Sequence, residues 1–298
     1  MTPSGFGVVF SDDTLDEFLS RDPESYAMIR DRFAYWDDIR IVLHGTEVRC
    51  SGNGFAGCAR LALLEVLYAR CRQLGVALNF GETIDAATLR DHFPDADVIV
   101  ASDGIGSRIR IRIRDQNTAA FRPDIKLMAN KFTRMGSTRP LTDFTYFFKE
   151  TPDGIIIAHT YQYEAGLSTW IFETDPECWA SHGFAEKTED EAARYLETLF
   201  SDELEGHGLI TNRSLWRNFP RVECAHWSHG NIVLLGDAKA TAHYSIGSGT
   251  KLAMECAIAL ADALLANADD VSAAFAAYEA ARRTPVEITQ HNAAVSLA

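Results

Sequence analysis

The segment 231–261 combines residue types and spacing that could hold a flat, partly anionic ligand. It reads NIVLLGDAKATAHYSIGSGTKLAMECAIALA: an apolar run, then Gly236-Asp237, a polar loop, and Gly247 and Gly249 before a run of small residues. A carboxylate at a strand end can accept a hydrogen bond from a ribityl hydroxyl, and glycine lets the backbone approach a planar ring closely. A helix after Gly249 would offer free N–H groups and a partial positive charge. These features suit a flavin; the alternative is an ordinary loop before a helix packed by small side chains.

A second candidate segment, 97–108, reads DVIVASDGIGSR. Its short apolar run is typical of a buried parallel strand, and a turn and a helix are expected to follow. The candidate ligand-binding residues here are Asp103, Gly104 and Arg108, although a plain strand-turn-helix explains the same pattern. The arginines at 108, 110, 112 and 114 alternate with isoleucine, which fits a solvated strand face as well as an anion-binding surface.

Further candidates lie outside these two segments. Arg60 begins an apolar helix expected over 57–74, and a guanidinium can pair with two phosphate oxygens at once. Aromatic side chains offer flat apolar area with a polar tip, so four residues are candidates for a substrate wall: His159, Tyr161, Tyr163 and Trp170.

Two other chemistries receive less support. Cys224, His226 and His229 have the spacing of metal ligands, but a fourth ligand and a second paired motif are missing, so a structural role is favoured. The sequence contains no G-x-S-x-G motif, which leaves acyl transfer without a nucleophile of the usual form.

The elements that must position these residues fall into an α/β pattern. Helices are expected over 14–19, 23–36, 188–199, 251–265 and 270–282, and a strand pair over 38–51 is followed by a strand over 76–80. From 125 to 173 the sequence is rich in β-strand segments without a strong helix, which indicates an antiparallel sheet inserted into an α/β lobe. Thr188 and Glu191 have capping-box spacing.

Composition limits the classes of partner. The 298 residues carry a formal charge of −14, which disfavours a nucleic-acid footprint, and no window is apolar enough for a membrane helix. The start of the chain has no signal-peptide pattern, and the six cysteines are scattered, so reduced thiols and a cytoplasmic location are expected.

The two motif segments resemble the Gly-Asp and Asp-Gly motifs of FAD-dependent aromatic hydroxylases of the para-hydroxybenzoate-hydroxylase-like group. The text SIGSGTKLAME is especially similar to the branch of anthraniloyl-CoA and salicyloyl-CoA hydroxylases, and an indole-hydroxylating branch from violacein biosynthesis is also similar. Further matching segments run through most of the chain: 5–12, the helix around Arg60, 130–138, 157–173 and 206–219.

This resemblance implies cofactor contacts for nine residues: Arg60, Asp103, Gly104, Arg108, Gly236, Asp237, His243, Gly247 and Gly249. It implies FAD as cofactor, NAD(P)H as co-substrate, and oxygenation of an electron-rich ring, with a coenzyme-A thioester of an amino- or hydroxybenzoate as the expected substrate. A free aromatic or indole compound is the alternative substrate. No catalytic base is evident, and the oligomeric state is left open.

The chain departs from the family pattern at several points. The chain does not open with the family's strand, G-x-G-x-x-G turn and helix; a G-x-G-x-x-G spacing occurs further along, at 52–57. Either the native protein is longer, which is the favoured explanation, or the chain is a non-catalytic remnant without flavin. Ala240 stands where the family often has histidine, and Cys256 where it has aspartate. The expected fold is an incomplete Rossmann-like FAD lobe over 1–114 and 208–298, with a β-rich substrate lobe over 115–207.

Overall fold

A computed structural model describes residues 6–52, 54–116 and 120–296. The chain divides into two compact units: unit 1 comprises 1–78 and 129–219, and unit 2 comprises 79–128 and 220–298. These boundaries differ from those expected from the sequence because β3 (Ile39–Leu43) pairs in parallel with β8 (Phe144–Thr151), which joins the N-terminal hairpin to the β-rich segment. Two strands that pair with each other carry the chain between the units: β7 (Pro123–Ser137) and β12 (Arg217–Cys224).

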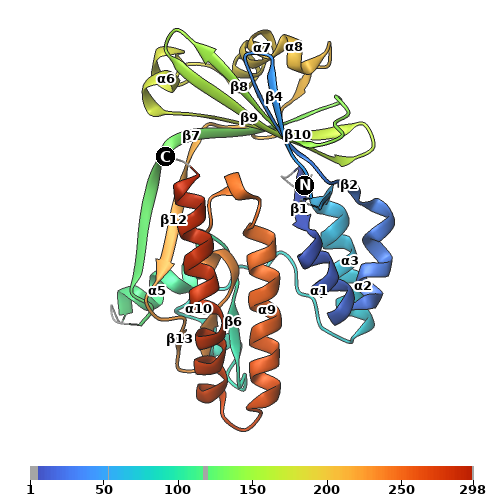
Figure 1. Ribbon diagram of the computed structural model, residues 1–298. Coiled ribbons are helices and arrows are strands. Elements are labelled where there is room, and N and C mark those ends of the chain that lie inside the picture. Colours follow the sequence, from blue (N-terminus) through green and yellow to red (C-terminus); the bar gives the residue numbers. More distant parts are fainter. Residues whose placement is uncertain (1–5, 53, 117–119, 297–298) are drawn as a thin grey trace. The chain divides into compact units, whose positions relative to one another are not determined.

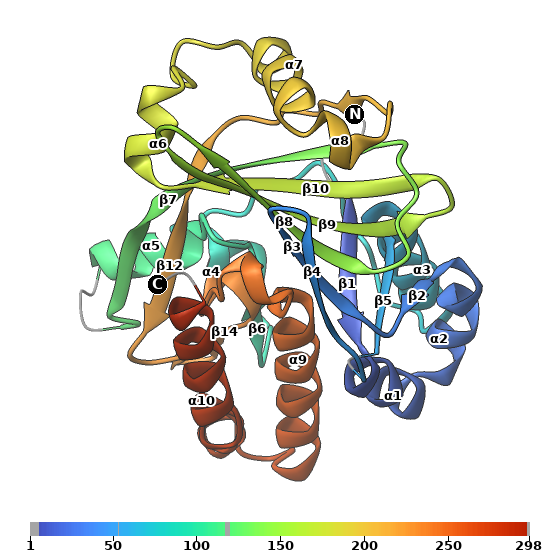
Figure 2. The ribbon, with the colours of Figure 1, turned by 45° about the horizontal axis from the view of Figure 1, so that its top comes forward.

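Unit 1 is built on a large, mostly antiparallel sheet with the described order β11-β7-β10-β9-β8-β3-β4. The remaining strands of this order are β4 (Thr46–Cys50), β9 (Gly154–Glu164), β10 (Leu167–Thr174) and β11 (Leu209–Ile210). Three helices cover one face of the sheet in Figures 1 and 2: α6 (Pro176–Ser181), α7 (Glu189–Leu199) and α8 (Ser201–Leu204). The predicted β-rich segment and the 38–51 hairpin are thus present.

Alternation along the strands divides the large sheet into two faces. On the helix-covered face, Trp170 and Phe172 pack against Leu196 and Phe200 in a continuous apolar cluster. Helix α7 is fixed at its start by the predicted capping box, in which Thr188 and Glu191 bond to each other's backbone N–H groups. The opposite face carries His159, because that residue is one position out of phase with Ala158 of the cluster.

The rest of unit 1 is a small sheet with three helices. Its described strands, in the order β1-β5-β2, are β1 (Gly7–Ser11), β5 (Phe55–Ala59) and β2 (Ala34–Trp36). The helices are α1 (Asp12–Arg21), α2 (Pro23–Ile29), which continues into the 3-10 turn η1 (Arg30–Arg32), and α3 (Arg60–Gln73). Helix α3 begins three residues later than expected because 57–59 pair with β1. The strand expected over 76–80 is not formed.

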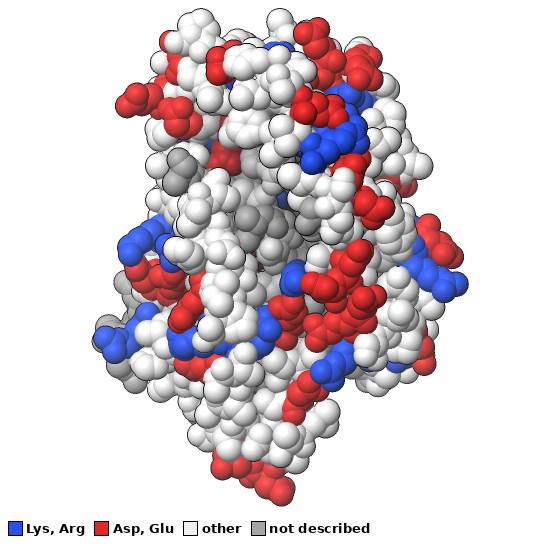
Figure 3. Space-filling model, viewed as in Figure 1, with Lys and Arg blue, Asp and Glu red and all other residues white. Residues whose placement is uncertain are grey.

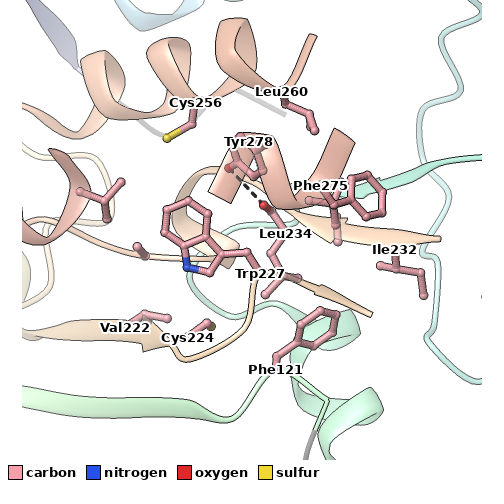
Figure 4. Packing of buried hydrophobic residues seen from close by; sticks show 14 of the residues in the cluster. Phe121, Val222, Cys224, Trp227, Ile232, Leu234, Cys256, Leu260, Phe275 and Tyr278 are labelled. Carbon is pink, nitrogen blue, oxygen red and sulfur yellow. Dashed lines mark hydrogen bonds between the residues drawn. The ribbon is translucent and has the colours of Figure 1, made fainter. Parts of the chain in front are cut away.

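Unit 2 contains a short sheet, β13-β14-β6, in which β14 (Ile232–Leu234) and β6 (Ile99–Ala101) run parallel. Its other elements are α4 (Leu89–His92), α5 (Arg108–Gln116), β13 (Ser228–His229), the 3-10 turns η2 (Gly236–Ala238) and η3 (Tyr244–Ile246), α9 (Gly249–Ala266) and α10 (Val271–Val295). Helices α9 and α10 lie side by side in Figures 1 and 2. Their inner faces meet a core that includes Trp227, Leu234 and Tyr278 (Figure 4).

The arginine-isoleucine segment is a helix and not a solvated strand face. Ile109 and Ile113 are both buried, which fits one helix face because residues four apart lie above one another. The predicted fold class, α/β with an antiparallel sheet inserted between two parts of an α/β lobe, is confirmed. Among the described residues, no helix has both the length and the apolar character needed to cross a membrane.

Candidate functional site

Both predicted cofactor motifs follow neighbouring parallel strands in unit 2. Leu234 pairs with Ala101, and the N–H of Leu235 donates to the carbonyl of Ala101 at 2.9 Å. The chain then leaves β6 through Asp103-Gly104 and leaves β14 through Gly236-Asp237. Since the carboxyl ends of parallel strands form one edge of a sheet, both turns emerge at the same edge, which is where open α/β sheets bind ligands.

The Asp103 carboxylate acts as the cap of helix α5. Its Oδ2 atom accepts hydrogen bonds from the N–H groups of Arg108 at 2.7 Å and Ile109 at 3.3 Å. Gly104 has a φ of 82°, and a side chain placed there would meet nothing within 4 Å. The backbone of this turn is therefore exposed at Gly104, next to the start of α5. The Asp103 carboxylate itself is already hydrogen-bonded to that helix.

Arg110, and not Arg108, joins the two motifs. The Arg110 side chain is fully buried: its Nη2 donates to the carbonyl of Ile105 at 2.6 Å, and its Nη1 donates to the carbonyl of Ala238 at 2.6 Å. Burial lowers the pKa of this guanidinium from its usual value, but an arginine remains charged at any physiological pH. Arg108 is exposed. The sequence pattern did not separate the two arginines, because strict alternation with isoleucine makes them equivalent.

A narrow crevice, with no room for a water molecule, lies between the Gly-Asp turn and the start of α9. Gly236, Asp237 and Gly249 line it, so the structure brings three of the predicted residues together. Asp237 is exposed at this edge. Gly249 begins α9, and a Cβ built on it would meet nothing within 4 Å, so its backbone is open to a ligand at the end of the helix that carries a partial positive charge.

His243 and Gly247 shape the turn that leads into α9. The Nδ1 atom of His243 accepts the N–H of Ser245 at 3.3 Å, and its ring lies 4.0 Å from that of Tyr244. Gly247 has a left-handed φ of 63° and donates its N–H to the carbonyl of Tyr244 at 2.9 Å. His243 is almost fully buried, and the contacts described here are with the turn residues Tyr244 and Ser245.

Arg60 belongs to unit 1. It is the first residue of α3, its backbone N–H donates to the carbonyl of Phe6 at 3.1 Å, and its side chain is exposed. The described contacts give the guanidinium no structural task, and its predicted contact with the cofactor stays a prediction.

Three of the four predicted substrate residues lie on the face of the large sheet opposite the helices, and Trp170 does not. Trp170 is fully buried beneath the helices, stacks on Phe147 and donates its Nε1–H to Ser168 at 3.1 Å. Tyr161 donates its hydroxyl to the carbonyl of Gly7 at 2.9 Å, and Tyr163 also packs on Gly7. These two tyrosines therefore hold the small sheet against the large one.

His159 forms the centre of a buried polar group on the same face. Its Nε2 lies 3.2 Å from the Oε2 of Glu173, while the Nδ2–H group of Asn130 donates to Oε1 at 2.9 Å. Tyr146, directly opposite His159 on β8, meets its ring edge-on at 4.9 Å. Burial, with a smaller contribution from the Glu173 charge, raises the pKa of Tyr146 to about 12. Glu173, Asn130 and Tyr146 were not predicted, because strand register brings them to His159.

The unit 2 geometry fits a flavin nucleotide. An exposed carboxylate follows one strand, bare glycine backbone follows both strands, and a long helix begins at the crevice. A family model described as the FAD binding domain matches residues 17–292. The chain belongs to this FAD-binding family. FAD is accordingly the cofactor, and the resemblance noted from the sequence is confirmed.

Individual relatives support the same family. The chain is 38% identical to salicyloyl-CoA 5-hydroxylase from Streptomyces sp, over 98% of this chain and 57% of that protein. It is 35% identical to 3-hydroxy-4-methyl-anthranilyl-[aryl-carrier protein] 5-monooxygenase from Streptosporangium sibiricum, over 96% of this chain and 75% of that protein. The chain thus spans little more than half the length of the first of these relatives.

A solved structure of 2-methyl-3-hydroxypyridine-5-carboxylic acid oxygenase has the same fold. It superimposes with a TM-score of 0.74 at 15% identity, covering 98% of this chain and 80% of that chain.

Proposed function

We propose that this protein is an FAD-dependent monooxygenase that hydroxylates an aromatic ring with NAD(P)H and O₂. The observation that carries the proposal is the pair of glycine-containing turns at one edge of the β6–β14 sheet, tied together by Arg110. Family membership indicates the cofactor, and the activities for which both relatives are named indicate the class of reaction.

The substrate we propose is a thioester of a hydroxy- or aminobenzoate. Salicyloyl-CoA and the anthranilyl carrier-protein conjugate in the relatives' names are both thioesters of such acids. An amino or hydroxyl group supplies the electron density that ring hydroxylation needs. On the face shown in Figure 3, the described Lys and Arg side chains lie in small groups among acidic ones, so an anionic carrier would be bound by a local cluster and not by a broad basic field.

The roles of the residues follow from their chemistry. When bound, FAD supplies the reduction of O₂ and the transfer of one oxygen atom to the ring. Asp237 would hold a ribityl hydroxyl of the cofactor, and the start of α9 would offer it N–H groups and a positive potential. In unit 1, Glu173 holds the imidazole of His159 in place on the large sheet.

The experiment is purification of the full chain followed by assay with three substrate types. We expect a yellow protein whose NAD(P)H oxidation is stimulated by salicyloyl-CoA or anthraniloyl-CoA, with a hydroxylated product found by mass spectrometry. Stimulation by free salicylate or indole alone would replace the thioester with a free aromatic substrate. A colourless protein that does not bind added FAD would identify a non-catalytic remnant and would overturn the proposal.

A further inference from the structure

Lys239 and Cys256 form a buried pair behind the crevice. Lys239 directly follows the η2 turn of the Gly-Asp motif and is 1% exposed; Cys256 lies on α9 and is also 1% exposed. The Nζ atom of Lys239 lies 3.0 Å from the Sγ atom of Cys256 and 3.8 Å from the centre of the Trp227 ring. The pair therefore connects the Gly-Asp turn to the helix on the other side of the crevice.

Two polar side chains of α10 lie near the Cys256 sulfur. Tyr278 donates its hydroxyl to the carbonyl of Leu234 at 3.4 Å, and Arg282 pairs with Glu255. Figure 4 shows Cys256 on α9, next to the core that contains Tyr278 and Trp227. The pair is thus a chemical constellation and not a lone thiol.

The amine of Lys239 is removed from water. Removal from water disfavours its charged form, so burial lowers the pKa of Lys239 from its ordinary value, an effect that the nearby thiol only partly offsets. A neutral amine carries the free electron pair that an ammonium lacks. With Nζ at 3.0 Å from sulfur, formation of a nitrogen-sulfur bond requires little movement.

We propose that Lys239 and Cys256 are a site of oxidative cross-linking by hydrogen peroxide. The Cys256 sulfur first attacks peroxide: an S–O bond forms, the O–O bond breaks, and one water leaves with the thiol proton. Sulfur is oxidised by two electrons and peroxide is reduced. The Lys239 amine then attacks sulfur, the N–S bond forms, the S–O bond breaks, and the departing hydroxide takes a proton from nitrogen to give a second water. One thiol, one amine and one peroxide become one sulfenamide and two waters.

The cross-link would fix the width of the crevice. It would join residue 239, two positions after Asp237, to α9 at Cys256, and both residues line the crevice with Gly236 and Gly249. Peroxide would thereby control the mobility of the Gly-Asp turn, whichever aromatic compound the protein accepts. Thiol reductants reverse a sulfenamide, so the control is reversible.

The test is peroxide treatment of the full chain, followed by trypsin digestion and mass spectrometry without reductant. The expected product joins peptide 222–251 to peptide 252–282 with a net loss of two hydrogen atoms, has no cleavage after Lys239, and disappears with dithiothreitol. A disulfide between Cys224 and Cys256 would have the same mass change but would leave Lys239 cleavable. That disulfide, a Cys256 sulfinic acid with unmodified Lys239, or unreacted Cys256 would each overturn the proposal.

Three variants serve as controls. Cys224→Ser should form the cross-link as the parent protein does, whereas Cys256→Ser and Lys239→Arg should abolish it. Cys256→Ser changes a single atom, and its far-UV circular dichroism should match that of the parent protein. A cross-linked peptide of unchanged yield in Cys256→Ser would refute the assignment of the sulfur atom.

Discussion

Arg110 places a positive charge inside unit 2, where its described hydrogen-bond partners are backbone carbonyls. Burying a charge destabilises a protein unless the charge is hydrogen-bonded. The three hydrogen bonds to the carbonyls of Ile105, Asp237 and Ala238 offset the free-energy cost of burying the guanidinium. The same contacts hold the two motif turns at a fixed separation. One side chain thus determines the geometry of both proposed cofactor segments.

Replacing Arg110 should therefore destabilise the protein and weaken FAD binding together. We expect Arg110→Met to lower the free energy of unfolding by about 2–3 kcal/mol, since it leaves buried carbonyls without donors. Arg108→Met is the matched control, and its exposed side chain should change stability by less than about 0.5 kcal/mol. Urea unfolding of both variants measures the difference, and equal effects would contradict the assigned role.

Tyr146 should make stability depend on alkaline pH. Its pKa is raised from 10.0 to about 12 in the folded protein, so the neutral form is favoured by folding. This contribution to stability is complete below pH 10 and is lost as the pH rises from 10 through 12. The loss in the free energy of unfolding is about 1 kcal/mol at pH 11. Urea unfolding at pH 9 and pH 11 should show a smaller loss for Tyr146→Phe than for the parent protein. An identical loss in both would show that Tyr146 does not titrate this way.

At the scale of elements, local signals were sufficient for some segments and not for others. The capping box of α7 and the glycine-led start of α9 were readable because each depends on residues within a few positions. Helix α5 was ambiguous because strict alternation also contains the four-residue spacing that places Ile109 and Ile113 on one helix face. β5 was missed because its strand state depends on pairing with β1, some 48 residues away.

The α7 cap offers a direct test at this scale. Thr188→Ala removes the side chain that accepts the N–H of Glu191 and should cost about 1 kcal/mol of stability. Glu191→Ala removes the reciprocal contact, and the double variant should cost less than the two single variants combined because the contacts share one box. Thermal unfolding of the three variants measures this coupling, and strict additivity would argue against a cooperative cap.

At the scale of the whole molecule, sequence reasoning gave the fold class and the family but not the assembly of the units. The parallel pairs β3–β8 and β6–β14 join segments separated by about 105 and 133 residues. No local pattern encodes such pairings, so unit boundaries and the neighbours of His159 were not predictable. The motif turns were predictable, because each is contained in one strand-turn-helix segment. That the two turns lie together was not predictable, because it depends on the parallel register of β6 and β14.

The account as a whole depends on FAD lying against the glycine backbone at the start of α9. Gly249 has open space where a Cβ would lie and no left-handed φ, so alanine at this position should leave folding intact. The decisive measurement is an FAD fluorescence titration of the parent protein and of Gly249→Ala. We predict that Gly249→Ala weakens FAD binding by about tenfold, or about 1.4 kcal/mol, because a methyl group occupies the cofactor's space. Unchanged FAD affinity in a folded Gly249→Ala protein would contradict the proposed site.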